Sequence, residues 1–153
     1  MITDHTITFP VGKIKKEDED LLKITKGAMM AGIKMSIAGN YIQDISKAIE
    51  EYIKKEGKKI NKDLGIIKML AGHGVGYKVH EEPYVPNFDD GSKGAKLVAG
   101  MVIAIEPMVN LGSKEIYQDK DGYTLRTVDH KNSAHFEHTI LITKDKPEIL
   151  TVL

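Results

Sequence analysis

The chain has 153 residues, of which 41% are hydrophobic and 29% charged, a balance typical of a single globular domain with a real core. The formal net charge of +0 and the lack of any apolar run near ~20 residues exclude a basic nucleic-acid binder and a membrane-spanning helix. The chain has no cysteine, which excludes disulfides, thiolate metal sites and a cysteine nucleophile, and we expect a cytoplasmic protein without a signal peptide.

The first half of the chain predicts one strand and two helices. Residues 2–12 alternate between apolar and polar side chains, which is typical of a strand. Residues 15–33 have four consecutive acidic residues at 17–20, in the first turn, and continue with an apolar stripe, which predicts a helix. A second helix is expected over residues 42–55, with Gly57 as its C-terminal cap.

The second half predicts short strands separated by turns. Residues 83–94 are rich in proline and glycine and predict a loop, and residues 98–109 are apolar enough for one buried strand. The other expected strands start near Leu64 and cover residues 72–80, 115–118, 123–128, 135–143 and 148–153, with a hairpin turn at 119–122. This order predicts an α+β fold, a curved and mostly antiparallel sheet covered by two helices.

Glycine occupies every second position around one histidine. Gly72, Gly74 and Gly76 carry no side chains, so backbone or ligand can approach closely and His73 stands free between them. The alternative is that His73 only caps a turn. His80 follows in the same segment. The alternative there is that Glu81 and Glu82 simply pair with Lys78.

Two carboxylates lie within apolar segments. Glu106 ends the run at 102–105 and precedes Pro107, so it is either costly to desolvate or the exposed end of a strand. A period of two puts Glu137 on one face with His135 and Thr139, and that face is either functional or plain surface. Asp4 near the first strand would usually be solvated.

These segments together predict a divalent-metal site. Residues 80–84 do not fit the H-E-x-x-H zinc motif, the glycine spacing is not a dinucleotide fingerprint, and no P-loop or G-x-S-x-G is present. Imidazole and carboxylate ligands without sulfur suit Mn, Fe, Co or Zn. Clustered carboxylates repel one another unless a cation compensates them, and a bound metal activates water near neutral pH.

The sequence resembles the C-terminal part of the catalytic domain of type I methionine aminopeptidases. The resemblance is carried, in the order of the family, by residues 4–12, 72–76, 79–83, 100–108, 121–124 and 133–139. It implies a partial pita-bread fold, with residues 1–153 forming a single domain truncated at its upstream half. It also implies hydrolysis that releases the N-terminal methionine of a peptide or nascent chain.

The resemblance further implies roles for individual residues. The metal ligands would be Asp4, His73, Glu106 and Glu137, with Asp4 and Glu137 bridging two ions. Glu106 would also move a proton in catalysis, and His80 would bond the scissile peptide. Tyr123 stands where the family has a substrate-contacting aromatic residue. Another aspartate of the family has no counterpart here, so one complete site and a second site lacking a ligand are expected.

The absent half leaves alternatives for this chain. Its activity would be impaired, and self-association or a complementing half-domain would cover the exposed sheet edge. A non-catalytic module that binds a peptide or a partner is the second reading, and a folded fragment without its own function is the third. Neither nucleic acid nor membrane is an expected partner.

Overall fold

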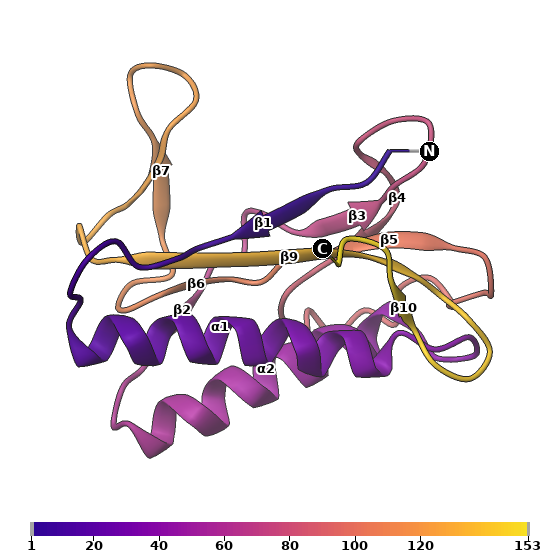
Figure 1. The fold of residues 1–153 in the computed structure, drawn as a ribbon, viewed down its shortest axis with the longest axis horizontal. Coiled ribbons are helices and arrows are strands. Elements are labelled where there is room, and N and C mark those ends of the chain that lie inside the picture. Colours follow the sequence, from indigo (N-terminus) through magenta and orange to yellow (C-terminus); the bar gives the residue numbers. More distant parts are fainter. Residues whose placement is uncertain (1, 153) are drawn as a thin grey trace.

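The computed structural model describes residues 2–152, and Figure 1 shows two helices against one face of a curved sheet. The helices are α1 (Lys16–Met35) and α2 (Ile42–Lys59). The strands are β1 (His5–Ile7), β2 (Gly65–Ile66), β3 (Gly72–Gly74), β4 (Glu81–Val85), β5 (Val102–Ile105), β6 (Met108–Asn110), β7 (Ile116–Gln118), β8 (Leu125–Thr127), β9 (Ser133–Leu141) and β10 (Glu148–Ile149). The predicted α+β order is confirmed.

Strand β9 is the centre of the sheet. It pairs antiparallel with β5 and β6 along one edge and with β1 and β10 along the other. Ile105 lies opposite His138 and Met108 lies opposite His135, so the register is the same on both sides of the break between β5 and β6. Glu106, which falls in that break, is therefore placed opposite Glu137. Two like charges in such a cross-strand pair are destabilising unless something compensates them.

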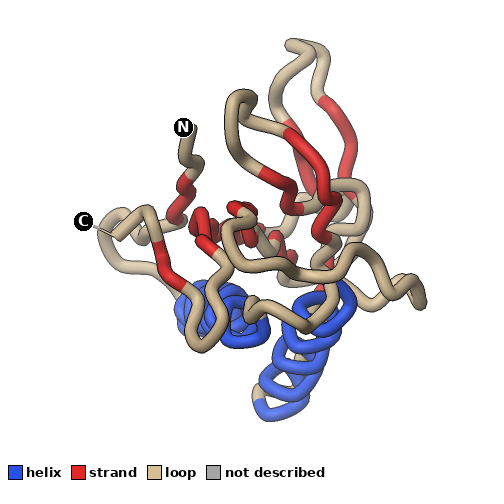
Figure 2. Tube along the Cα trace, turned by 90° about the vertical axis from the view of Figure 1, so that its right-hand side faces the viewer, coloured by secondary structure: helices blue, strands red, loops and turns tan. Residues whose placement is uncertain are grey.

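The two helices cover only one face of the sheet, as Figure 2 shows from the side. Helix α1 packs on β9, and the alternation along β9 sends Phe136 and Ile140 into the core beneath the helices. Helices α1 and α2 approach closely at Gly32, where a Cβ atom would lie 2.8 Å from Cγ1 of Ile49. The opposite face of β9 is thus free of helices, and it carries His135, Glu137 and Thr139.

Several predicted boundaries were wrong, each for a physical reason. Helix α2 continues through the buried Gly57 to Lys59. The chain turns back after the helix, where the backbone N–H of Lys62 donates to the Gly57 carbonyl. The predicted loop at 83–94 begins with strand β4, which includes Pro83. The predicted single strand at 98–109 is two strands, because Glu106 and Pro107 interrupt it. The last strand ends at Ile149, and Leu153 lies outside the described residues.

The hairpin of β7 and β8 forms a separate two-stranded sheet that projects from the main sheet, in orange in Figure 1. The predicted hairpin is confirmed, and its turn is held by Asp121, whose carboxylate accepts the backbone N–H groups of Tyr123 and Thr124. Neither helix within residues 2–152 is long and apolar enough to cross a membrane.

Candidate metal centre

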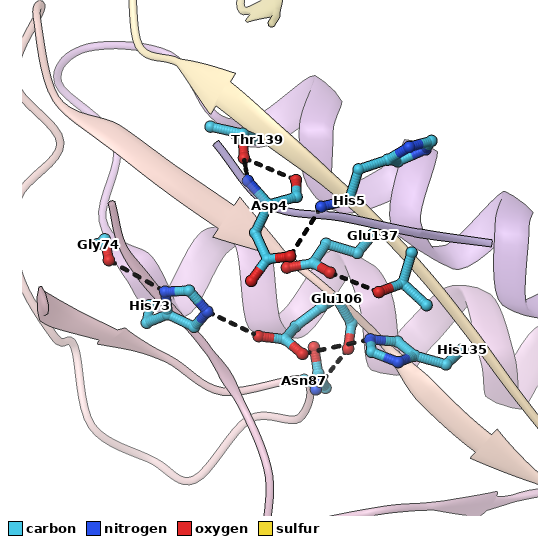
Figure 3. Close-up of polar contacts among 10 residues, drawn as sticks. Asp4, His5, His73, Gly74, Asn87, Glu106, His135, Glu137 and Thr139 are labelled. Atoms are coloured by element: carbon cyan, nitrogen blue, oxygen red, sulfur yellow. Dashed lines mark hydrogen bonds and ion pairs between the residues drawn. The ribbon is translucent and has the colours of Figure 1, made fainter. Parts of the chain in front are cut away.

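One face of the sheet gathers acidic and imidazole side chains from four separate segments. Strands β3 and β9 supply His73 and Glu137, the break after β5 supplies Glu106, and the residue before β1 is Asp4. Figure 3 shows these four side chains pointing toward one another, together with His135. All four residues predicted as metal ligands therefore meet in a single cluster.

Glu106 lies between two imidazoles. Its Oε1 is 3.3 Å from Nε2 of His73, and its Oε2 is 3.2 Å from Nε2 of His135. Its backbone carbonyl accepts a hydrogen bond of 3.2 Å from the buried side-chain amide of Asn87. The carboxylate is buried and not at an exposed strand end, so that alternative reading of Glu106 is wrong.

Glu137 is the most buried acid of the cluster, with 3% of its surface exposed. Its Oε2 accepts a hydrogen bond of 2.8 Å from Thr6 Oγ1, whereas its Oε1 is buried and has no hydrogen-bond partner among residues 2–152. Burial raises the pKa of Glu137, and the negative charges of Glu106 and Asp4 raise it further, against the Thr6 hydrogen bond. The surface reading of Glu137 is therefore wrong.

Asp4 is anchored to the sheet although it lies close to the start of the chain. Its backbone N–H donates to Thr139 Oγ1 at 2.8 Å, and the same hydroxyl donates to the Asp4 carbonyl at 2.8 Å. Thr139 is completely buried, so this double contact holds the first strand against β9. One Asp4 oxygen accepts the next backbone N–H, that of His5, at 2.9 Å.

His73 is oriented by its own strand. Its Nδ1 lies 3.0 Å from the Gly74 carbonyl, so Nδ1 carries the proton and Nε2 offers a lone pair to the cluster. The flanking glycines are required by close backbone contacts. A Cβ atom on Gly72 would overlap the Ala104 carbonyl oxygen, and one on Gly74 would overlap the Glu82 carbonyl oxygen.

Substituting Gly74 by alanine should therefore push β3 and β4 apart. We expect Gly74→Ala to destabilise the protein by about 1–3 kcal/mol, the usual cost of overpacking, and to weaken metal binding through His73. Gly76→Ala is the matched control, because its added methyl meets only the flexible end of the Glu81 side chain. Chemical denaturation of both variants checks the difference, and equal stabilities would contradict it.

A cavity of about 430 Å³ opens beside the cluster. His80, Glu106 and His135 form part of its polar wall, and the rest is largely apolar, including Ile67, Leu70, Met108, Ile116 and Leu125. His80 packs its ring against that of His73, with centroids 4.2 Å apart. Tyr123 does not line this cavity; it lies in the turn of the hairpin with 91% of its surface exposed.

The cluster fits a divalent ion by its geometry and chemistry. Ligand atoms of Asp4, His73 and Glu137 all lie within 4.8 Å of one another. Those of Glu106, His135 and Glu137 form a second such group. Three carboxylates and two imidazoles without sulfur suit Mn, Fe, Co or Zn, and the unpartnered Glu137 oxygen is the kind of buried atom that a cation satisfies.

The sequence-based prediction missed His135 as a member of the cluster. The signal was present, because the period of two puts His135 on the same face as Glu137. What sequence could not show is that Glu106 would lie 3.2 Å from its Nε2.

The chain is similar to known metallopeptidases in sequence and in structure. The sequence model of metallopeptidase family M24 matches residues 1–144. Methionine aminopeptidases of Clostridium perfringens and Aquifex aeolicus are 44% and 47% identical over 99% and 98% of the chain. The matches span only 58% and 57% of those relatives. The crystal structure of a methionine aminopeptidase from Thermotoga maritima superposes with a TM-score of 0.91 at 38% identity, covering 99% of this chain and 58% of that one.

Proposed function

Because this chain belongs to metallopeptidase family M24, we propose that it carries the metal and peptide sites of an aminopeptidase that releases N-terminal methionine. The observation that carries the proposal is the convergence of Asp4, His73, Glu106 and Glu137 on the helix-free face of the sheet. The curved antiparallel sheet with two helices is the expected part of the pita-bread fold.

The proposed ion site consists of Asp4, His73, Glu106 and Glu137. A divalent ion held there would lower the pKa of water and polarise the scissile carbonyl. Glu106 takes a proton from the attacking water and returns it to the leaving amine, since its carboxylate lies at the border of the cluster and the cavity. His80 lines the same cavity and is exposed enough to donate a hydrogen bond to the carbonyl oxygen as charge develops.

The cavity beside Glu106 supports an unbranched apolar first residue. Its volume of about 430 Å³ is within the range of ligand pockets, and its walls are mainly aliphatic and thioether side chains such as those of Ile67 and Met108. A flexible methionine side chain packs well in such surroundings. Tyr123 lies outside this lining with 91% of its surface exposed, and its substrate contact stays a prediction.

Release of free methionine from the peptide Met-Ala-Ser tests the proposal. With Mn²⁺ or Co²⁺ added, we expect free methionine from this peptide and none from its N-acetylated form, because an aminopeptidase requires a free amino terminus. Leu-Ala-Ser measures the selectivity of the cavity. If the chain binds metal and peptide but releases nothing, a non-catalytic peptide-binding role takes the place of the proposed one.

Metal binding should also stabilise the fold, independently of activity. At a free-ion concentration of 100 times Kd, a single site that binds only the folded state adds about 2.7 kcal/mol, which raises the melting temperature by roughly 5–10 °C for a chain of this size. Differential scanning calorimetry with and without Co²⁺ measures the shift. Mg²⁺ serves as the control ion, because it prefers sites built from oxygen ligands and water. An unchanged melting temperature with Co²⁺ would argue against an ion in this cluster.

Self-association stays a prediction, and the first strand is where we propose it occurs. Within residues 2–152, β1 pairs with β9 alone, and Ile7 at its end and Phe9 and Val11 just after it are 55%, 67% and 82% exposed. An unpaired edge with apolar side chains favours pairing with a second copy. Sedimentation should show a dimer that dissociates in the double variant Phe9→Asp, Val11→Asp, whereas a monomer at all concentrations would contradict the prediction.

A further inference from the structure

The backbone carbonyl of Glu106 lies where the neighbouring strand has ended. Strand β3 faces Ile103 of β5 with Gly74 and begins two residues earlier, so it stops one residue short of the position opposite Glu106. The Pro107 carbonyl accepts the backbone N–H of Phe136 in β9, and successive carbonyls of an extended chain point to opposite sides. The Glu106 carbonyl therefore points away from β9, where burial without a donor would be costly.

The side chain of Asn87 supplies the donor that the strand does not. Its Nδ2 donates to the Glu106 carbonyl at 3.2 Å, and Figure 3 shows this amide beside Glu106. Asn87 is completely buried, follows the end of β4 by two residues and does not line the cavity. An effect of Asn87 on the reaction would therefore pass through Glu106 and not through contact with a substrate.

Helix α2 holds the chain on both sides of Asn87. The Ser46 hydroxyl donates to the Pro86 carbonyl at 2.6 Å, and the Glu50 carboxylate accepts the backbone N–H of Asp89 at 3.1 Å. Ser46 is itself buried, so water does not compete for the first of these bonds. The amide that contacts Glu106 is thus fixed by a helix on the opposite face of the sheet from the metal cluster.

We propose that Asn87 is a positioning residue, which fixes the peptide of Glu106 so that its carboxylate stays between His73 and His135. The inference rests on the proposed function and deepens it, because Glu106 is there both an ion ligand and a proton carrier. Outer hydrogen bonds commonly orient metal-binding carboxylates, and losing one typically costs about 10–100-fold in metal affinity or activity. The alternative is that the Asn87 contact serves the fold alone.

Leucine substitutions separate these two roles. Leucine has nearly the shape of asparagine, so Asn87→Leu removes the amide without opening a large cavity. The Glu106 carbonyl loses its donor, but the buried Oδ1 of Asn87, which has no partner among residues 2–152, disappears too, so the net change in stability should be small. Asn110→Leu is the matched control, because Asn110 is also completely buried, donates to a backbone carbonyl, that of Ser113, and has an unpartnered Oδ1 within the described residues.

Titration with Co²⁺, followed by calorimetry and visible absorption, gives the first readout. We expect Co²⁺ to bind Asn87→Leu at least about tenfold more weakly than the wild type, with a changed absorption band, since that band reports ligand geometry. With Met-Ala-Ser, kcat should fall about tenfold or more while KM stays within about threefold, because Asn87 does not line the cavity. Asn110→Leu should keep the wild-type values. Wild-type affinity and absorption in Asn87→Leu would overturn the inference.

A readout on the metal-free protein separates this inference from the proposed function. In protein with ¹³C-labelled glutamate side chains, the Glu106 carboxyl resonance is identified by its loss in Glu106→Gln. It should shift in Asn87→Leu and not in Asn110→Leu. An unshifted resonance would overturn the inference whether or not the protein binds Co²⁺. If the wild type takes up no Co²⁺, the proposed function fails and this resonance alone decides the role of Asn87.

Ser46→Ala provides the same test if Asn87→Leu does not fold. This variant removes the hydroxyl that holds Pro86, the residue before Asn87, and leaves the amide itself in place. The Glu106 carboxyl resonance should then shift in the metal-free protein, because the amide is no longer held firmly against the carbonyl. An unchanged resonance in Ser46→Ala would overturn the inference in that case.

Discussion

Replacing Glu106 with glutamine should lower the rate of methionine release by about 10²–10⁴-fold, the range typical of a lost general acid–base group. The change keeps the size of the side chain and its packing at the break between β5 and β6. It removes the charge that lies 3.3 Å from His73 and 3.2 Å from His135. The proton taken from water would then have no carboxylate to accept it, and the ion would lose one ligand.

Steady-state kinetics with Met-Ala-Ser and saturating Co²⁺ measure the effect. Glu115→Gln is the matched control, because Glu115 is exposed in the described structure and belongs to neither group of candidate metal ligands. We expect that control to keep kcat within about twofold, as for surface substitutions in general. Full activity of the Glu106→Gln enzyme would remove Glu106 from the reaction and would require another base beside the cavity.

Glu137→Gln should have opposite effects on the metal-free and metal-loaded protein. Burial of the Glu137 carboxylate, with Glu106 and Asp4 nearby, raises its pKa, so the charged form destabilises the fold when no cation is bound. A neutral amide of the same shape avoids that cost, and we expect the metal-free variant to be more stable than the wild type at neutral pH. The same variant should lose the rise in melting temperature on adding Co²⁺, because the proposed ion site uses Glu137.

The stability difference should depend on pH in a definite direction. Because the folded-state pKa of Glu137 lies above its unfolded value, the folded protein binds this proton more tightly than the unfolded chain does. Wild-type stability contributed by this group is therefore present at low pH and is lost as pH rises from the ordinary value of 4.5 through the raised pKa. The advantage of metal-free Glu137→Gln should grow over that window and then level off.

Urea denaturation of both proteins between pH 4 and pH 8, in the presence of a chelator, checks this dependence. Glu115→Gln should show no such pH-dependent gain over the wild type, since that carboxylate is exposed. A constant difference across the whole pH range would show that Glu137 titrates alike in the folded and unfolded states. In that case burial of Glu137 would not raise its pKa on folding.

The elements with strong local periodicity were predicted closely. The apolar stripe of α1 and the acidic residues of its first turn locate that helix to within two residues at its C-terminus and one at its start. The alternation at 135–143 locates β9, and glycine at positions 72 and 74 correctly indicates close backbone approach, whereas Gly76 meets only the Glu81 side chain. These signals depend on neighbours in the chain, which is why they can be read without the fold.

The errors arose where tertiary contacts override local preference. Proline and glycine at 83–94 predicted a loop, but β4 forms because it pairs with β3, which contains His73. Gly57 was predicted to end α2, yet the helix continues to Lys59 and the chain turns back only at the bond from Lys62 to Gly57.

The sequence by itself determined the kinds of side chain available, their order and the face of each strand on which they stand. Side-chain chemistry and strand period are local properties, and they were enough to predict a sulfur-free cluster of acids and histidines. Only the tertiary structure decided that Glu106 would lie opposite Glu137 and between His73 and His135. That arrangement depends on strand register and on pairing between distant segments, which are set by packing of the whole sheet against its two helices.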